Sequence, residues 1–184
     1  MPPKSKCTRE QITETAFQMV REEGLNCLKA RDLAQKLGTS TAPIFTAFNS
    51  VDEIRDEVVK KANALYGEYI KEGLKQTPAF KGVGMKYIQF AKDEPELFKI
   101  LGINKKFTDN FLPAYDDNSP EVLNVLENKY GMSDVAAKKL YNHMSVYAFG
   151  FASLYAQRIY LFTMEDISRM LSEVYAAMTE KFGE

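Results

Sequence analysis

A glycine-centred turn between two short amphipathic segments, within residues 29–48, constrains this chain more than any other feature. Before the turn, Leu33 and Leu37 lie one helical turn apart, and Gly38 follows where a helix can end in positive φ without steric cost. After the turn, Pro43 falls where the first turn of a second helix tolerates a missing N–H group. This stretch is therefore expected to form a helix, a tight turn and a second helix.

The second helix of this pair is expected to have one buried face and one outward face. Ile44 and Phe48 are four residues apart, so they share a face and can dock on the first helix. The hydroxyls of residues 39–41 are expected to cap the helix start. The side chains left to point outward are Thr41, Ala42, Phe45 and Thr46. A short helix that projects small and hydroxyl-bearing side chains suits the major groove of DNA.

The segments on either side of this pair complete a longer pattern. Residues 8–62 resemble the N-terminal DNA-binding domain of the TetR family of transcriptional regulators, because several elements match in order and spacing. The matching segments are Glu22-Glu23-Gly24-Leu25, then Lys29-Ala30-Arg31-Asp32-Leu33-Ala34, then Leu37-Gly38-Thr39-Ser40-Thr41-Ala42-Pro43-Ile44-Phe45, and finally Phe48 followed by Asp52-Glu53-Ile54. The resemblance covers about a third of the chain.

The resemblance implies a role for each residue of the paired helices. The positions that usually meet the DNA backbone hold Lys29, Thr39, Ser40 and Phe45. The positions that face the edge of the groove hold Arg31, Thr41, Ala42 and Thr46. Pro43 and the methyl group of Thr46 can pack against a thymine methyl. Arg31 can reach a guanine through two hydrogen bonds or rest on a phosphate, and both alternatives stay open.

Two positions depart from the usual family pattern. Phe45 stands where a tyrosine is common, and it lacks the hydroxyl that donates to a phosphate. The next helix opens with residues 49–52, which lack the lysine that is common there. Because both changes remove phosphate contacts, DNA affinity is expected to be modest or to depend on Lys4, Lys6 and Arg9 of a basic N-terminal arm.

Helical periodicity continues through the rest of the chain, without the alternation typical of strands. The first helix is expected to run from Thr8, which forms a capping-box pattern with Gln11, to about Glu23, before Gly24. Later helices are expected at about 51–76, 78–92, 95–101, 120–130, 133–161 and 164–182, with a helical turn near 107–112 inside a loop. The expected fold class is all-α.

The helices divide into two expected domains. Residues 1–50, with the start of a fourth helix to about residue 62, form a three-helix helix-turn-helix DNA-binding domain, and residues 51–184 form a larger helical domain for ligand binding and dimerisation. The helix at 133–161 carries two apolar stripes, so it is buried on both sides. In the TetR family the last two helices of each subunit form a four-helix dimer interface, and the resemblance therefore implies a homodimer.

The larger domain is rich in aromatic residues, since the chain holds 12 Phe and 10 Tyr and most of them follow residue 64. Aromatic walls with a few hydroxyls suit a flat apolar small molecule. Each residue alone is more simply part of a packed core, whereas for the group the resemblance favours a pocket. The candidate ligand-binding residues are Tyr87, Phe90, Phe98, Phe111, Tyr115, Met144, Tyr147, Phe151 and Tyr155, together with Phe107 and Met85.

Other chemistries have no support in the sequence. Cys7, Cys27 and His143 are too few and too scattered for a metal site or a disulfide framework, and His143 is expected to be half-buried. No Gly-rich phosphate loop, HExxH or GxSxG pattern occurs, so neither an enzyme nor a cofactor is expected. No apolar run approaches the ~20 residues that span a bilayer, and no signal peptide opens the chain, so a cytoplasmic location is expected.

The expected function is a homodimeric repressor that binds a near-palindromic DNA operator and is released by an apolar or aromatic effector. The net charge of −1 argues against a protein that coats nucleic acid by charge alone. Two alternatives remain: a ligand-independent regulator or activator, and a helical small-molecule-binding or interaction protein that has lost DNA binding.

Overall fold

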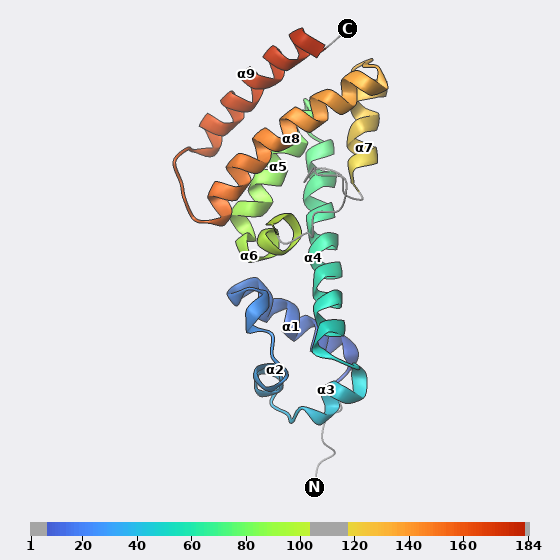
Figure 1. The fold of residues 1–184 in the computed structure, drawn as a ribbon, viewed down its shortest axis with the longest axis vertical. Helices are drawn as coiled ribbons and strands as arrows, with labels where there is room; N and C mark the ends of the chain where they lie inside the picture. Colours follow the sequence, from blue (N-terminus) through green and yellow to red (C-terminus); the bar gives the residue numbers. More distant parts are fainter. Residues whose placement is uncertain (1–6, 104–117, 183–184) are drawn as a thin grey trace. The chain divides into compact units, whose positions relative to one another are not determined.

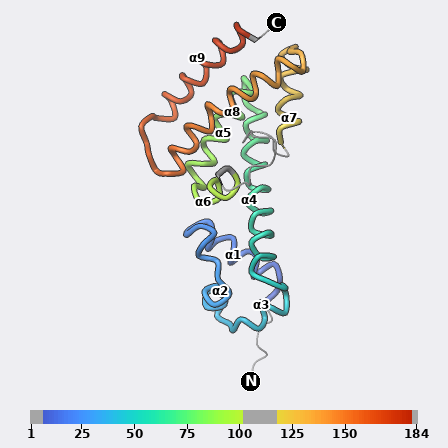
Figure 2. Tube along the Cα trace, viewed as in Figure 1, coloured from blue at the N-terminus to red at the C-terminus, as the bar shows by residue number. Residues whose placement is uncertain are grey.

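The computed structural model describes residues 7–103 and 118–182, and every regular element in those ranges is a helix (Figure 1). The all-α expectation is confirmed to that extent. The chain forms two compact units, whose course Figure 2 traces. The first holds the residues up to Ala64 together with residues 96–103, and the second begins at Leu65. The segment 96–103 was not expected to pack with the N-terminal helices.

The first unit begins with α1 (Arg9–Glu23), which has the boundaries expected from the sequence. Thr8 Oγ1 accepts from the backbone N–H of Gln11 at 3.2 Å, and Gln11 Oε1 accepts from the N–H of Thr8 at 3.0 Å. Gly24 ends the helix with a φ of +81° and a ψ of 171°, a conformation that is open essentially only to glycine. The predicted capping box and stop signal are both confirmed.

Two short helices follow a 3₁₀ turn, η1 (Leu25–Cys27): α2 (Ala30–Lys36) and α3 (Ala42–Ala47). Gly38 has a φ of +66° in the turn between them, as its position predicted. The prediction that hydroxyls cap α3 is wrong, because Thr41 adopts a helical conformation and its side chain makes no capping hydrogen bond. A capping residue needs an extended backbone to aim its oxygen at the first free N–H groups.

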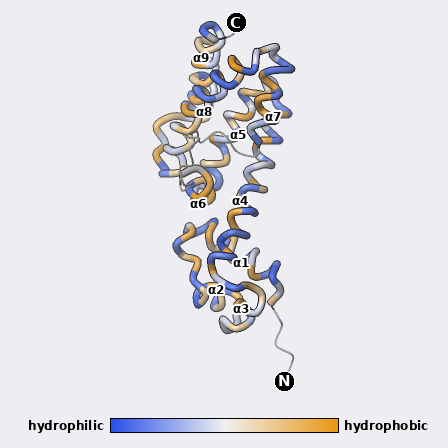
Figure 3. Tube along the Cα trace, turned by 45° about the vertical axis from the view of Figure 1, so that its right-hand side comes forward, coloured by the Kyte–Doolittle hydropathy of each residue, from blue (hydrophilic) through white to orange (hydrophobic). Residues whose placement is uncertain are grey.

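The long helix α4 (Val51–Leu74) starts where Ser50 Oγ accepts from the N–H of Glu53 at 3.1 Å. Ile54, Val58 and Ala62 are buried as expected. Figure 3 shows apolar and polar residues alternating along the helices. The core of the first unit consists of Ile12, Ala16, Phe17, Met19, Val20, Leu28, Leu33, Ala34, Ile44, Phe48, Ile54, Val58, Ala62, Leu97, Phe98 and Ile100.

In the second unit, α5 (Ala79–Asp93) packs against α8 (Asp134–Ala156) and α9 (Met164–Phe182). The unit also contains α7 (Ser119–Asn124) and the π-helical segment η3 (Val125–Lys129). Near the end of α4, Gly73 permits a close approach to α5, since a Cβ there would lie 2.7 Å from Cα of Val83. The short α6 (Pro95–Phe98) leads into the π-helical segment η2 (Lys99–Ile103).

Helix α9 has the expected boundaries, whereas α8 was expected to continue to residue 161 and ends at Ala156. Arg158 adopts a φ of +60°, and the Tyr155 hydroxyl donates to the Phe162 carbonyl at 2.9 Å. The apolar residues Ile159, Tyr160 and Leu161 look like a continuation of the helix, but they are exposed after this turn. The predicted helical turn at 107–112 lies outside the described residues. None of the helices in the described ranges is both long enough and apolar enough to span a membrane.

Candidate functional site

Helix α3 is held by two buried side chains and leaves the rest of its surface open. Ile44 and Phe48 are buried, as the sequence predicted. Phe45 is 50% exposed, which is unusual for a side chain of its size. Ala42 and Thr46 are also exposed, while Thr41 and Pro43 are half-buried. The exposed part of α3 is therefore a small surface with an aromatic ring beside a methyl group and a threonine.

The Thr46 hydroxyl is occupied within its own helix, because Oγ1 donates to the Ala42 carbonyl at 2.9 Å. Its proton is therefore not available to an outside acceptor, and the side chain offers chiefly its methyl group. Such a side chain is suited to an apolar contact, for which the C5-methyl of thymine is a partner in the major groove.

The other residues of the predicted DNA surface lie on α2 and the turn. Lys29 precedes the first residue of α2, and both Lys29 and Arg31 are exposed. Ser40 is exposed and Thr39 half-buried. The Thr39 N–H donates to the Ala34 carbonyl at 3.0 Å, which fixes the path of the chain out of α2. The turn thus has a defined backbone before α3 begins.

Arg9, which was expected to support DNA binding from a basic arm, makes several contacts within the first unit. Its guanidinium donates to the Ala47 carbonyl at 2.8 Å and to Glu53 Oε1 at 2.8 Å, with Glu57 at 3.6 Å. Arg9 is the first residue of α1, Ala47 the last of α3, and Glu53 lies in the first turn of α4. The side chain therefore joins three helix ends, and it remains 42% exposed. Lys4 and Lys6 lie outside the described residues.

The carboxylate of Glu53 is the centre of this junction. Oε2 accepts from the backbone N–H of Asn49 at 2.7 Å, in addition to the bond from Arg9 to Oε1. The Asn49 N–H and then the Arg9 guanidinium lower the pKa of Glu53 below its ordinary value, since both stabilise the charged form. Glu53 in turn raises the pKa of Arg9. The ion pair and the hydrogen bonds thus stabilise the same arrangement of Arg9, Asn49 and Glu53 beside the end of α3.

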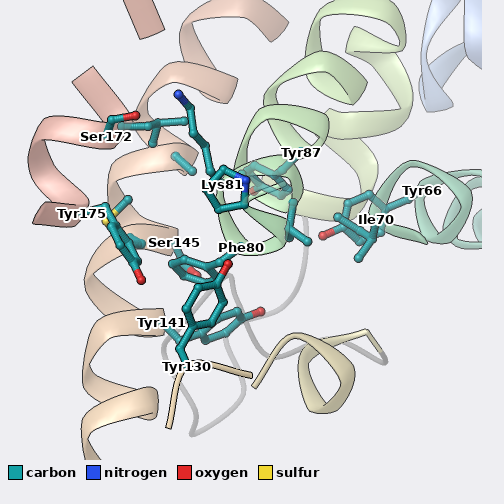
Figure 4. A pocket seen from close by; sticks show the side chains of 16 residues that line it. Tyr66, Ile70, Phe80, Lys81, Tyr87, Tyr130, Tyr141, Ser145, Ser172 and Tyr175 are labelled. Atoms are coloured by element: carbon teal, nitrogen blue, oxygen red, sulfur yellow. The ribbon is translucent and has the colours of Figure 1, made fainter. Parts of the chain in front are cut away.

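The second unit contains a cavity of about 270 Å³ among α4, α5, α8 and α9 (Figure 4). Two of the predicted ligand-binding residues, Tyr87 and Met144, line it. The lining residues are Tyr66, Ile70, Pro78, Phe80, Lys81, Val83, Gly84, Tyr87, Tyr130, Tyr141, Met144, Ser145, Ala148, Leu171, Ser172 and Tyr175. The cavity is mostly aromatic and aliphatic, with hydroxyl groups and one amine.

The other predicted ligand-binding residues do not line this cavity. Phe90 is buried, and its ring centre lies 5.3 Å from those of both Tyr66 and Tyr69. Phe98 is buried in the first unit. Tyr147 and Phe151 form an edge-on pair 5.2 Å apart near the end of α8. Tyr155 is also buried there, whereas Met85 borders a different, more polar hollow, and Phe107, Phe111 and Tyr115 lie outside the described residues.

Sequence reasoning missed most of the tyrosines of the cavity. Tyr66 on α4 and Tyr175 on α9 are half-buried, and Tyr130, which follows η3, is exposed. Tyr141 is buried and donates to Ser119 Oγ at 3.1 Å. A tyrosine at the margin of an apolar stripe is the available sequence signal, because such a residue can place its ring inward and its hydroxyl near water.

The isolated cysteines and histidine do not gather into a site. His143 is exposed on α8, so the expectation that it is half-buried is wrong. Burial raises the pKa of the Cys27 thiol, which favours the unreactive thiol form. Within the ranges that the structure describes, no three His, Cys, Asp or Glu residues are placed to hold a metal ion.

Compared with known proteins, the chain matches no family model and no curated sequence.

Proposed function

We propose that this chain is a sequence-specific DNA-binding regulator of transcription of the TetR type, with α3 as the helix that enters the major groove. The observation that carries the proposal is the division of α3 into an anchored and an open side. Ile44 and Phe48 are buried, while Ala42, Phe45 and Thr46 are exposed at the end of a defined turn. A recognition helix needs both properties, because its backbone must be fixed while its outer side chains reach base edges.

In this proposal the residues of α2, the turn and α3 make two kinds of contact with DNA. Lys29 and Ser40 contact phosphates and set the register, and Thr39 and Phe45 pack along the sugar–phosphate backbone. Thr41, Ala42, Pro43 and Thr46 face the bases, where methyl groups recognise thymine. Arg31 contacts either a guanine or a phosphate.

A homodimer through α8 and α9 completes the proposed regulator. Val135 and Val146 on α8 are 61% and 55% exposed, and their separation in sequence corresponds to about three helical turns, so they share one face. A Cβ added to Gly150, farther along α8, would meet no atom within 4 Å. In this proposal, pairing of this face with a second copy brings two α3 helices to half-sites about 34 Å apart or slightly more, as a near-palindromic operator requires.

The cavity is the proposed effector site. Helix α4 contributes Tyr66 and Ile70 to its wall, while the same helix contributes Ile54 and Val58 to the core of the first unit. A ligand that changes the position of α4 changes the spacing of the two α3 helices. Ligand and operator then weaken each other's binding reciprocally, because each favours a different state of one equilibrium. The regulator is accordingly a repressor that its effector releases.

A second function, a helical small-molecule-binding protein without DNA binding, is favoured by one specific observation. Phe45 has no hydroxyl, so one potential phosphate contact is absent, and Arg9 already donates to Ala47 and Glu53 within the chain. The cavity is present whichever function is correct. Direct selection of binding sites separates the two proposals.

The experiment is selection of binding sites from random duplex DNA by the purified chain at about 0.1 M salt. The regulator proposal expects enrichment of a palindrome whose half-sites lie about one helical turn apart. The variant Ala42→Glu places a carboxylate on the exposed surface of α3 and should abolish enrichment. The matched variant Ala64→Glu, at an exposed alanine of α4, should leave it unchanged. A folded dimer that enriches no sequence would contradict the regulator and support the binding protein.

A further inference from the structure

The walls of the cavity in the second unit carry an uneven set of charges. Among its lining residues, Lys81 is the one charged side chain, and no aspartate or glutamate faces the cavity within the described ranges. Elsewhere on α5, Lys86 pairs with Glu72 at 2.5 Å. Lys81 is half-buried. Within the described residues, no carboxylate forms an ion pair with its ammonium group. Lys81 also borders the more polar hollow that Glu68, Glu72 and Asp93 line, but none of these carboxylates pairs with it. Its ammonium group therefore favours a ligand with a negative charge.

The first turn of α5 adds to the positive potential at the same place. Pro78 precedes the helix, borders the cavity and has no side-chain atom that can accept a hydrogen bond from the first N–H groups. Lys81 follows in the first turn of this 15-residue helix. The free N–H groups and the helix dipole favour an anion near this end. The amine and the helix end therefore favour the same sign of ligand charge.

The remaining wall favours a flat ring. Phe80 and Tyr175 lie with ring centres 5.9 Å apart, and Tyr66 and Tyr87 lie at 6.0 Å on another part of the wall. Figure 4 shows these rings around the hollow, with the Lys81 side chain directed toward Ser172. Burial raises the pKa of the Tyr175 phenol, so this group stays protonated and can donate a hydrogen bond. Aromatic walls with a few donors bind planar ligands that carry one polar end.

The cavity volume sets the ligand size. A cavity of about 150 Å³ in a protein core accommodates benzene. The cavity here is about 270 Å³, which is a little less than twice as large. Two fused rings with one small substituent fit this space, whereas a single ring leaves much of it empty. Unfilled apolar space forfeits dispersion contacts, so the larger ligand is favoured.

We infer that the cavity binds a planar, two-ring aromatic molecule that carries one carboxylate or similar anionic group, with the rings among Phe80, Tyr66 and Tyr175 and the anion at Lys81 and Ser172. Only the role of this ligand as the effector rests on the proposed function. Binding itself does not require DNA.

The test compares three probes of equal shape: 2-naphthoate, its neutral amide 2-naphthamide, and the cation 2-naphthamidinium. Their affinities for the full chain are measured by titration calorimetry without DNA. The carboxylate should bind about ten-fold tighter than the amide or more, and the amidinium should bind weakest. Equal affinities for the three probes, preference for the cation, or binding of none of them would overturn the inference.

Variants test whether the probes bind in this cavity. Lys81→Gln should reduce the preference for the carboxylate over the amide to about two-fold or less, while Lys75→Gln, at an exposed lysine before α5, should keep it. Ala148→Leu adds bulk to a buried wall residue and should remove binding of all three probes. Circular dichroism and thermal unfolding check that each variant folds. Undiminished binding to folded Ala148→Leu would overturn the assignment to this cavity.

The site selection and the calorimetry together separate this inference from the proposed function. If naphthoate binds through Lys81 but no DNA sequence is ever bound, the ligand inference holds and the regulator proposal fails. If an operator is bound but no probe binds the chain, the regulator proposal holds and the ligand inference fails.

Discussion

The guanidinium of Arg9 lies over the ring of Phe48, with its central carbon 3.9 Å from the ring centre. Phe48 directly follows the last residue of α3, and it is almost fully buried. The same guanidinium donates to the Ala47 carbonyl and to Glu53. A cation over an aromatic face is attracted by the ring quadrupole, and here the ion pair and the hydrogen bond hold the cation in place. Arg9 therefore positions the end of α3, while its side chain stays partly exposed.

The variant Arg9→Met tests this positioning role. It keeps the aliphatic stem against Phe48 but removes the ion pair and the hydrogen bonds. We expect the melting temperature to fall by a few degrees and the affinity for every DNA sequence to fall together, since the orientation of α3 is loosened. Binding to a selected operator and to unrelated DNA is measured side by side. Lys71→Met, which removes an exposed pair with Glu68, should change neither quantity. Loss confined to one base position would contradict a positioning role.

Thr46 gives a prediction about base recognition. Because its hydroxyl donates within α3, Thr46→Val keeps the methyl group and should preserve operator preference. Thr46→Ser keeps the hydroxyl and loses the methyl, so it should weaken operator binding by about 1 kcal/mol and relax the preference at one position. Site selection with the three proteins measures both effects. If Thr46→Val relaxes the preference for the operator sequence and Thr46→Ser keeps it, the hydroxyl of Thr46 contacts the base and its methyl group does not.

The start and the end of α1 were predictable from sequence because local chemistry decides them. Thr8 and Gln11 satisfy each other's backbone N–H groups, and Gly24 takes a conformation closed to other residues. The role of Arg9 was not predictable, since its partners Ala47 and Glu53 are distant in sequence and meet it only after the three helices pack. Lysines and arginines near a chain start look alike in sequence whether they contact solvent, DNA or the protein itself.

Two glycines with positive φ allow a matched stability test. Gly24 has an extended ψ as well as a φ of +81°, so we expect Gly24→Ala to destabilise the chain by about 1–3 kcal/mol. Its Cβ would also lie 2.8 Å from Glu96 Oε2. Gly38→Ala should cost about 1–2 kcal/mol, since no atom lies within 4 Å of its Cβ position. Urea unfolding measures both. Asparagine should be better tolerated than alanine at 38 but not at 24, and equal behaviour at both sites would refute the distinction.

The pKa of Glu53 predicts a dependence of stability on pH. Because the Asn49 N–H and Arg9 lower this pKa from its ordinary value of 4.5, the folded chain releases the proton more readily than the unfolded chain. The stabilisation is therefore complete above about pH 4.5 and is lost as the pH falls through the lower folded value. Glu53→Gln should flatten this acid limb when unfolding free energy is measured from about pH 6 to about pH 3. Glu22→Gln, at an exposed position of α1, serves as the control. An unchanged slope in Glu53→Gln would show that other carboxylates carry the acid response.

The cavity shows where sequence reasoning reaches its limit. Tyr87 and Met144 both line the cavity, whereas Tyr147 and Phe151, on the same helix as Met144, lie in a separate aromatic cluster with Phe162. Periodicity identifies which face of a helix is apolar. It does not tell a packed face from a hollow one, because that depends on how the side chains of several helices fill the volume between them.

The last prediction concerns assembly, and it is based on the exposed valines of α8. If the face that holds Val146 pairs with a second copy, Val146→Glu buries a carboxylate without a partner and should convert the chain to a monomer at micromolar concentration. Operator binding should fall with it, since a single copy contacts one half-site. Phe45→Glu is the complementary control: this residue is exposed on α3, so the variant should remain a dimer and lose DNA binding. Sedimentation velocity measures the mass of each protein. A wild-type chain that sediments as a monomer at about 10 μM would exclude the dimer, and with it an operator read by two α3 helices.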